Sequence, residues 1–313
     1  MLKELFTTLA QFTQYVQAVD TTNTLDDLAP SARLARKAVE SMTTAPVYNA
    51  IIISDDEELL EALRSAIANR TMAHHVSFDA VNRRRSGGSD TYRYEVEQMQ
   101  RNYMQGYYAA MDELLRLLDS NIDADDTSSP AAIWQNSRYG RLLAQCRLRR
   151  TEDFDLVYPI DLSYHFFYRT VPLQVESLTT RLQSYYTRIE EASGGVGVSP
   201  AQATESAPVL AASAASVQPQ LDLALAKLTI AKALRRFDIA EFPATLRNLF
   251  TESKESRTAR DERTDAQRLA ADLEAEVNAI IENVDMVLSD YSDHNYCSTS
   301  AYNTPDDLII MAP

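Results

Sequence analysis

Two adjacent histidines, His74 and His75, are the side chains whose types and spacing most resemble a reactive or metal-binding site. They lie in the stretch TMAHHVSFDAVNRRRSGGSD, residues 71–90, with three arginines close behind. A zinc site needs three or four Cys, His or carboxylate ligands, and the chain has only four histidines and two cysteines, without ligand spacing. We therefore interpret the stretch as the end of a helix, where the arginines offset the negative end of the helix dipole.

This helix is predicted to begin within the sequence SDDEE, with Ser54 as its cap and Glu57 bonding back to it. The residues predicted to form its buried face recur at helical spacing: Leu59, Leu60, Leu63, Ile67, His74, Phe78 and Val81. On this reading His74 lies at the edge of the core and His75 lies off the buried face.

Four other motifs lack residues that the binding or catalytic sites they resemble require, or have a simpler explanation. Asp119, Asn121 and Asp123 match the first ligands of a calcium loop, but Ala124 replaces the glycine and Pro130 the bidentate glutamate. The stretch SGGVGVS follows a predicted helix and lacks the lysine of a phosphate-binding loop. HNYC at 294–297 has no second ligand pair. The acidic pairs lie at predicted helix starts or at a terminus, where capping and solubility account for them. The sequence predicts no cofactor and no metal.

Tyrosine is abundant, with 16 residues against 9 phenylalanines and 1 tryptophan. Tyrosine is favoured where one end of the ring is buried and the other is wet, either at a core boundary or at an interface. Both readings remain open from the sequence. If the clusters face a partner, the candidate interface residues are Tyr92, Tyr94, Tyr108, Arg147, Arg149 and Arg150.

Composition excludes two classes of partner. The net charge of −15 gives the long-range field the wrong sign for nucleic acid phosphate or an anionic membrane. No window approaches the roughly 20 apolar residues of a membrane span. The amphipathic N-terminus is not typical of a secretory signal, and two cysteines make no disulfide framework. We expect a cytoplasmic protein without specific nucleic-acid binding or membrane insertion.

Hydrophobic periodicity predicts a mainly α protein, a multi-helical bundle with a small β element. Helices are expected over 2–19, 26–42, from Ser54 to the SGGSD break, from Asp90 through Leu118, and over 172–192, 219–236 and 252–290. Apolar and aromatic residues alternate from Phe154 to Tyr168, which is typical of a strand that Pro159 confines to a sheet edge. We expect this strand near 154–169 to pair with DLIIMA at 307–312.

The predicted organisation has three parts. Residues 1–192 form an N-terminal helical lobe that contains the β segment. Residues 193–219 are rich in small residues with one charge, which is typical of a linker. Residues 220–313 form a helical hairpin and tail.

Three stretches in this order carry a resemblance: TLDDLAPSARLARKAVESMTTAPVYNAI, LDLALAKLTIAKALRRFDIAEFPATLRN and the closing DDLIIM. The layout resembles helical proteins from prophage-like regions of gut bacteria and, more loosely, the head–tail connector (adaptor) proteins of tailed phages. The resemblance implies a virion or assembly role, often as a ring between portal and tail. The chain departs from the simplest adaptors in its greater length, its predicted β segment and its linker.

The sequence thus favours a non-enzymatic structural or assembly protein of phage origin that binds protein partners, with self-association into a ring and a place in the virion as expectations. The alternatives are a cytoplasmic helical interaction module unrelated to phage, and an enzyme with a pocket around Tyr164, His165 and Tyr168.

Overall fold

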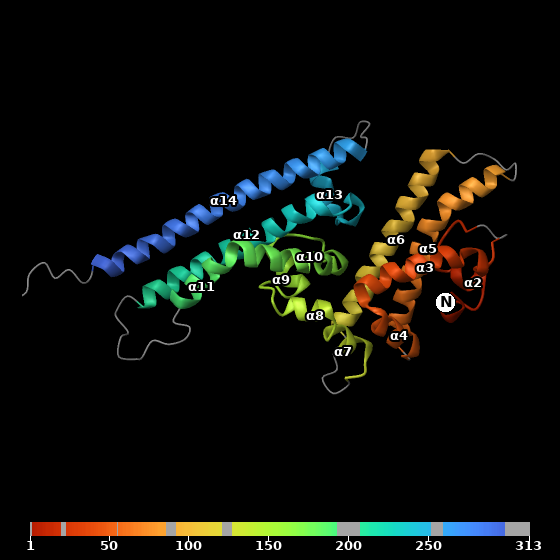
Figure 1. Cartoon of the computed structure of the whole chain (residues 1–313), viewed down its shortest axis with the longest axis horizontal. Coiled ribbons are helices and arrows are strands. Elements are labelled where there is room, and N and C mark those ends of the chain that lie inside the picture. Colours follow the sequence, from red (N-terminus) through yellow and green to blue (C-terminus); the bar gives the residue numbers. More distant parts are fainter. Residues whose placement is uncertain are drawn as a thin grey trace, which may run out of the picture.

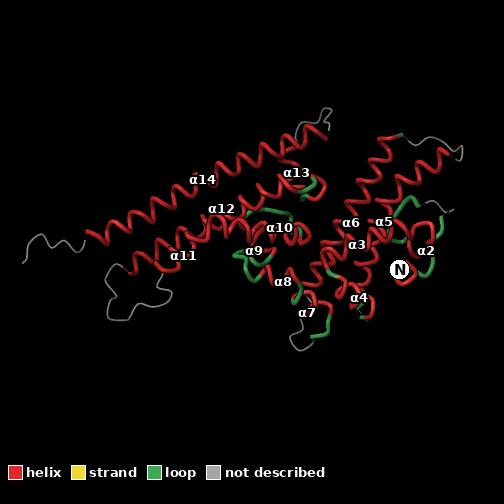
Figure 2. Tube along the Cα trace, viewed as in Figure 1, coloured by secondary structure: helices red, strands yellow, loops and turns green. Residues whose placement is uncertain are grey.

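A computed structural model describes residues 2–19, 23–54, 56–85, 92–120, 127–192, 207–251 and 259–297. These residues form helices joined by loops and contain no strand (Figures 1 and 2). The helices before the first long connection are α1 (Leu2–Leu5), α2 (Leu9–Phe12), α3 (Leu25–Thr43), α4 (Ala45–Ile53), α5 (Glu57–Arg85) and α6 (Arg93–Ser120). Those that follow are α7 (Pro130–Gln135), α8 (Arg138–Leu143), α9 (Thr151–Val157), α10 (Tyr164–Ser177), the π-helical turn η1 (Leu178–Leu182) and α11 (Gln183–Ala192). The last group is α12 (Ala207–Arg236), the 3₁₀ turn η3 (Ile239–Glu241), α13 (Ala244–Thr251) and α14 (Ala259–Cys297).

The mainly helical prediction is confirmed, but the small β element near 154–169 is wrong. This stretch forms α9, a loop around Pro159, and the start of α10. The Asp155 carboxylate accepts hydrogen bonds from the backbone N–H groups of Ile160 (2.8 Å) and Leu162 (3.0 Å), and so it closes the loop. Ser163 then caps α10 by accepting from Phe166 N at 3.2 Å. The alternation spans two helices and a turn, and local caps decide the outcome. The expected partner segment 307–312 lies outside the described residues.

Several helix boundaries in the structure differ from those predicted from the sequence. The helix expected over 2–19 is two short helices, α1 and α2, with a cap at Thr8. Helix α3 begins after a capping box in which Thr24 and Asp27 bond reciprocally. Asp56 caps α5 by accepting from Leu59 N, whereas Ser54 ends α4 by donating to Ile51 O. The last part of the predicted linker, from Ala207 on, belongs to α12.

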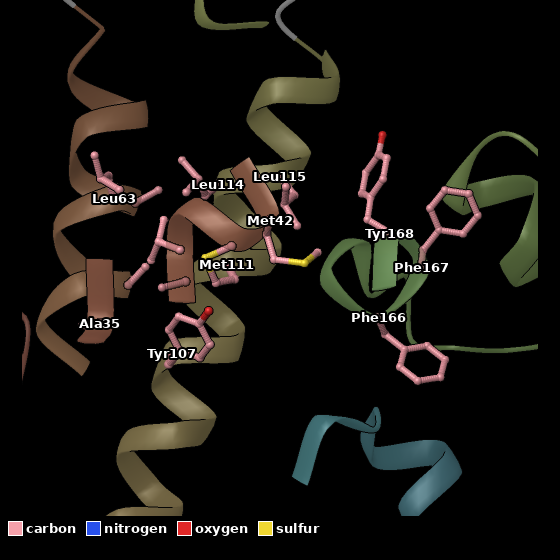
Figure 3. Close-up of a cluster of buried hydrophobic side chains, with 14 of the residues drawn as sticks. Ala35, Met42, Leu63, Tyr107, Met111, Leu114, Leu115, Phe166, Phe167 and Tyr168 are labelled. Atoms are coloured by element: carbon pink, nitrogen blue, oxygen red, sulfur yellow. The ribbon is translucent and has the colours of Figure 1, made fainter. Parts of the chain in front are cut away.

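The long helices are held by two adjoining hydrophobic clusters. The larger one joins α3, α5, α6 and α10, and Figure 3 shows Met42, Leu63, Met111 and Leu115 meeting between them. It continues into α12 and α14 through residues such as Ile230 and Ala270. The smaller cluster joins η1 and α11 to residues 217–228 of α12 and 277–288 of α14. Figure 1 shows α14 lying along α12. The α5–α6 hairpin projects at the end of the molecule opposite to the C-terminal end of α14.

None of the helices described is both long and apolar enough to cross a membrane.

Candidate functional site

The end of the α5–α6 hairpin carries a group of large, exposed apolar side chains. Phe78 and Val81, in the last turns of α5, are 62% and 53% exposed, and Tyr92 and Tyr94, at the start of α6, are 64% and 66% exposed. The two helices are antiparallel, so the last turns of α5 and the first turns of α6 lie at the same end of the hairpin (Figure 1). The tyrosine rings stack with centroids 5.7 Å apart. We call residues 78–85 and 92–101 the hairpin tip.

Local bonds organise the α6 side of the hairpin tip. The backbone N–H of Tyr92 donates to Glu95 Oε2 at 3.0 Å, which holds the first turn of α6 closed. A surface hollow of about 450 Å³ beside it is lined by Tyr94, Glu95, Glu97, Gln98, Met99 and Arg101. Its lining combines the apolar surfaces of Tyr94 and Met99 with one arginine, one amide and two glutamates, and the apolar surfaces can receive an apolar segment.

The hairpin tip also differs in charge from the rest of the chain. Its sequence holds five arginines (Arg83, Arg84, Arg85, Arg93 and Arg101) and three carboxylates (Asp79, Glu95 and Glu97), whereas the whole chain has a net charge of −15. A local excess of positive charge on a strongly acidic protein favours an acidic partner at this surface.

The predicted interface residues fall in three places. Tyr92 and Tyr94 lie together on the hairpin tip. Tyr108 packs at the edge of the core, 5.1 Å between ring centroids from His165, and burial raises its pKa.

The three arginines have contacts within the chain. The Arg147 guanidinium lies over the Tyr186 ring and 3.5 Å from Glu190. Arg149 donates to the backbone oxygens of Cys146 (3.1 Å) and Ala144 (3.2 Å). Arg150 is 3.6 Å from Glu152. These interactions join the loop before α9 to α11 and to its own backbone, apart from the hairpin tip.

A second surface feature is a groove of about 840 Å³ at the base of the hairpin, lined by α5, α6 and residues 15–17. Two hydrogen bonds fasten the N-terminal segment there. Asn69 Nδ2 donates to Tyr15 O at 3.3 Å, and Tyr103 Oη donates to Gln17 O at 2.7 Å. Three glutamates and one arginine line this groove, and the arginine, Arg116, pairs with Glu113. Glu58 and Glu61 therefore give the groove a net negative charge.

Gly106 sits where α6 approaches Asn69 most closely. A Cβ at this position would overlap the Asn69 side-chain oxygen and lie 2.8 Å from its Cγ. We expect Gly106→Ala to destabilise the protein by about 1 kcal/mol, because displacing Asn69 costs more than the helix propensity of alanine returns.

In an Asn69→Ala background the sign should reverse, with Gly106→Ala stabilising by about 0.5–1 kcal/mol. Denaturant unfolding of the four chains in this double-mutant cycle measures the coupling. Equal effects of Gly106→Ala in both backgrounds would contradict the predicted overlap.

The residues of the expected enzyme pocket have packing and capping roles. His165 is buried against the rings of Tyr107 and Tyr108, and desolvation lowers its pKa to about 3. Tyr168 Oη donates to Asp119 Oδ1 at 2.6 Å, and Tyr164 Oη donates to Glu152 Oε1 at 2.5 Å. The carboxylate beside His165 is that of half-buried Asp112, which accepts from His165 N and Ser163 Oγ. Neither the hollow at the hairpin tip nor the groove at its base is lined by these aromatic residues.

His74 is half-buried, as predicted for a residue at the edge of the core, whereas His75 is buried and its predicted place off the buried face is wrong. Desolvation, and to a smaller extent the nearby charge of Arg70, lower the pKa of His74. Within the described part of the chain, no three His, Cys, Asp or Glu side chains lie close enough together to hold a metal ion. Of the calcium-like loop, Asp119 bonds Tyr168, while Asn121 and Asp123 lie outside the described residues.

Sequence reasoning missed Phe78 and Val81 as surface residues. Both continue the apolar spacing of α5, so they were expected to be buried, but the buried residues described on α5 end at Val76 and the last turns lie beyond the core. Comparison of the chain with protein-family models, curated proteins and solved structures finds no significant match.

Proposed function

We propose that this protein is a non-enzymatic structural or assembly component, of the phage head–tail connector kind, that works through protein–protein contacts made by the hairpin tip. One observation carries the proposal: Phe78, Val81, Tyr92 and Tyr94 are more than half exposed at the same end of one hairpin. Single exposed apolar residues are ordinary on a protein surface, but several large ones gathered at one end of a hairpin favour an interaction site there.

The composition of the hairpin tip supports a protein partner. Interfaces are enriched in tyrosine, phenylalanine and arginine, and their binding energy concentrates in such anchors. Stacked tyrosines lose little conformational entropy when they are covered, because each has few rotatable bonds.

The charge of the whole chain is compatible with the connector role. A protein with a net charge of −15 repels phosphate, so DNA passing beside it slides and is not held. The competing proposal is an interaction module unrelated to phage. Portal and terminase genes beside the gene for this protein would favour the connector role, and their absence would favour the module.

The first test is the solution mass of the purified chain over a concentration series, by sedimentation or light scattering. We expect a mass that rises above the monomer value of 35.1 kDa with concentration. The double variant Phe78→Ser/Tyr92→Ser should stay at the monomer mass, because it removes an apolar anchor from each helix of the hairpin tip.

A matched control is Ile53→Ser/Leu156→Ser, which removes two apolar side chains that are 81% and 86% exposed elsewhere on the surface. This control should assemble like the unmodified chain. A constant 35.1 kDa for the unmodified chain at every concentration would contradict self-assembly through the hairpin tip.

A further inference from the structure

We infer that the hairpin tip of one copy binds residues 306–311, DDLIIM, of a second copy. This inference rests on the proposed function and names the partner surface. It assigns a sequence segment outside the described residues to an exposed surface that is within them.

The two surfaces match in chemistry. The hairpin tip offers the exposed apolar side chains of Phe78, Val81, Tyr92 and Tyr94, and its sequence holds five arginines and three carboxylates. The segment offers two adjacent carboxylates, Asp306 and Asp307, followed directly by four apolar residues, 308–311. Arginine binds carboxylate by paired, charge-assisted hydrogen bonds, and burial of the apolar residues provides the main binding free energy.

The distribution of charge singles out this end of the chain. Residues 269–313 contain nine Asp and Glu residues and no Lys or Arg. Three of the nine already pair with neighbouring helices: Glu274 with Arg235, Glu276 with Lys227 and Asp285 with Arg188. Asp306 and Asp307 form the one adjacent acidic pair of this region in the sequence, and the longest apolar run directly after an acidic residue follows them, so they match the composition of the hairpin tip.

The segment must come from a second copy because its own hairpin tip is out of reach. Helix α14 has 39 residues and is therefore about 58 Å long. Figure 1 shows its Cys297 end pointing away from the α5–α6 hairpin, which lies beyond the Ala259 end. Asp306 is nine residues past Cys297 and reaches at most about 32 Å when the chain is fully extended.

The contact is therefore heterologous, since different surfaces of the two copies meet. Each copy in a pair keeps one unused hairpin tip or one unused segment, so further copies can add at both ends. The relative rotation of successive copies decides whether the assembly closes or continues.

A mixing experiment tests this pairing. The tip variant Phe78→Ser/Tyr92→Ser keeps an intact segment, and the segment variant Leu308→Ser/Ile310→Ser keeps an intact hairpin tip. Each full-length variant alone should require at least about tenfold more protein to associate than the unmodified chain. Mixed in equal amounts, the two should form a species of twice 35.1 kDa and grow no further.

The control for the segment is Thr299→Ala/Thr304→Ala, which changes the same region outside DDLIIM and should assemble normally. Folding of each variant is checked by its helical circular dichroism. Assembly of the unmodified chain should also weaken as salt rises from 0.05 to about 0.5 M, because ions screen the arginine–carboxylate pairs.

The outcomes separate the two proposals. If the unmodified chain assembles, the tip variant does not and the segment variant still does, the hairpin tip receives another surface, and this inference is overturned while the proposed function stands. If the unmodified chain never assembles, the proposed function fails, and the inference fails with it. A dimer formed only in the mixture supports both.

Discussion

Lowering the pH from 7 to 4 is expected to reduce the free energy of unfolding by about 3 kcal/mol through His165 alone. His165 is buried between Tyr107 and Tyr108 of α6, and desolvation lowers its pKa to about 3. Arg169 and Arg70 face it and lower the pKa further. As the pH falls, His165 of the unfolded chain binds a proton near pH 6.5, whereas His165 of the folded chain binds one only near pH 3. The stabilisation is therefore complete above pH 6.5 and is lost as the pH falls toward 3.

The measurement is denaturant unfolding at pH steps between 4 and 7 for the unmodified chain and for His165→Phe. The phenylalanine keeps a ring against the two tyrosines and does not titrate, so the variant should lose about 3 kcal/mol less over this range. Tyr108→Phe serves as the control, because it keeps both His165 and a ring beside it, and it should retain the full pH dependence. Parallel curves for the unmodified chain and His165→Phe would show that the imidazole is not buried as a neutral group.

Replacing Asp112 with alanine should lower the free energy of unfolding by about 2–3 kcal/mol at pH 7. Asp112 Oδ1 accepts hydrogen bonds from His165 N at 2.7 Å and Ser163 Oγ at 2.9 Å. It thereby ties α6 to the first turn of α10 and satisfies a buried backbone donor. Burial raises the pKa of Asp112, which partly offsets the gain from its two bonds.

Asp112→Asn tests whether the acceptor oxygen or the charge matters. It keeps an oxygen at the same place and avoids burying a carboxylate, so it should cost less than about 1 kcal/mol. The neighbouring Glu113 pairs with exposed Arg116, and Glu113→Ala should change stability by no more than about 0.5 kcal/mol. Equal losses for the alanine and asparagine variants would assign the effect to charge or packing, not to the hydrogen bonds.

Helices with strong periodicity and caps were predictable from the sequence. Leu28, Ala35 and Val39 recur on the buried face of α3, and Tyr103, Tyr107, Met111 and Leu114 do so on α6. The stretch 154–169 misled because its alternation of large side chains is a strand pattern. Asp155 and Ser163 instead bond to nearby backbone N–H groups, and this local chemistry favours a helix, a turn and a second helix.

The candidate site was only partly predictable. Tyr92 and Tyr94 were named from composition alone, and both are exposed at the hairpin tip. Phe78 and Val81 could not be named, because an apolar residue on a helix face has the same sequence pattern whether or not another helix covers it. Tyr108 shows the converse, since it belongs to the same tyrosine-rich helix yet packs against His165.

The amino-acid sequence was sufficient to predict the helical class of this protein, because hydrophobic period and capping are local properties that act within a few residues along the chain. It also determined the contrast between an arginine-rich stretch at 83–101 and an acidic region that begins at 269. Which apolar side chains remain uncovered follows from the packing of the helices, and it is this packing that leaves four of them exposed at one end of the α5–α6 hairpin. Burial depends on the lengths and packing of several helices together, so no single stretch of sequence contains that information.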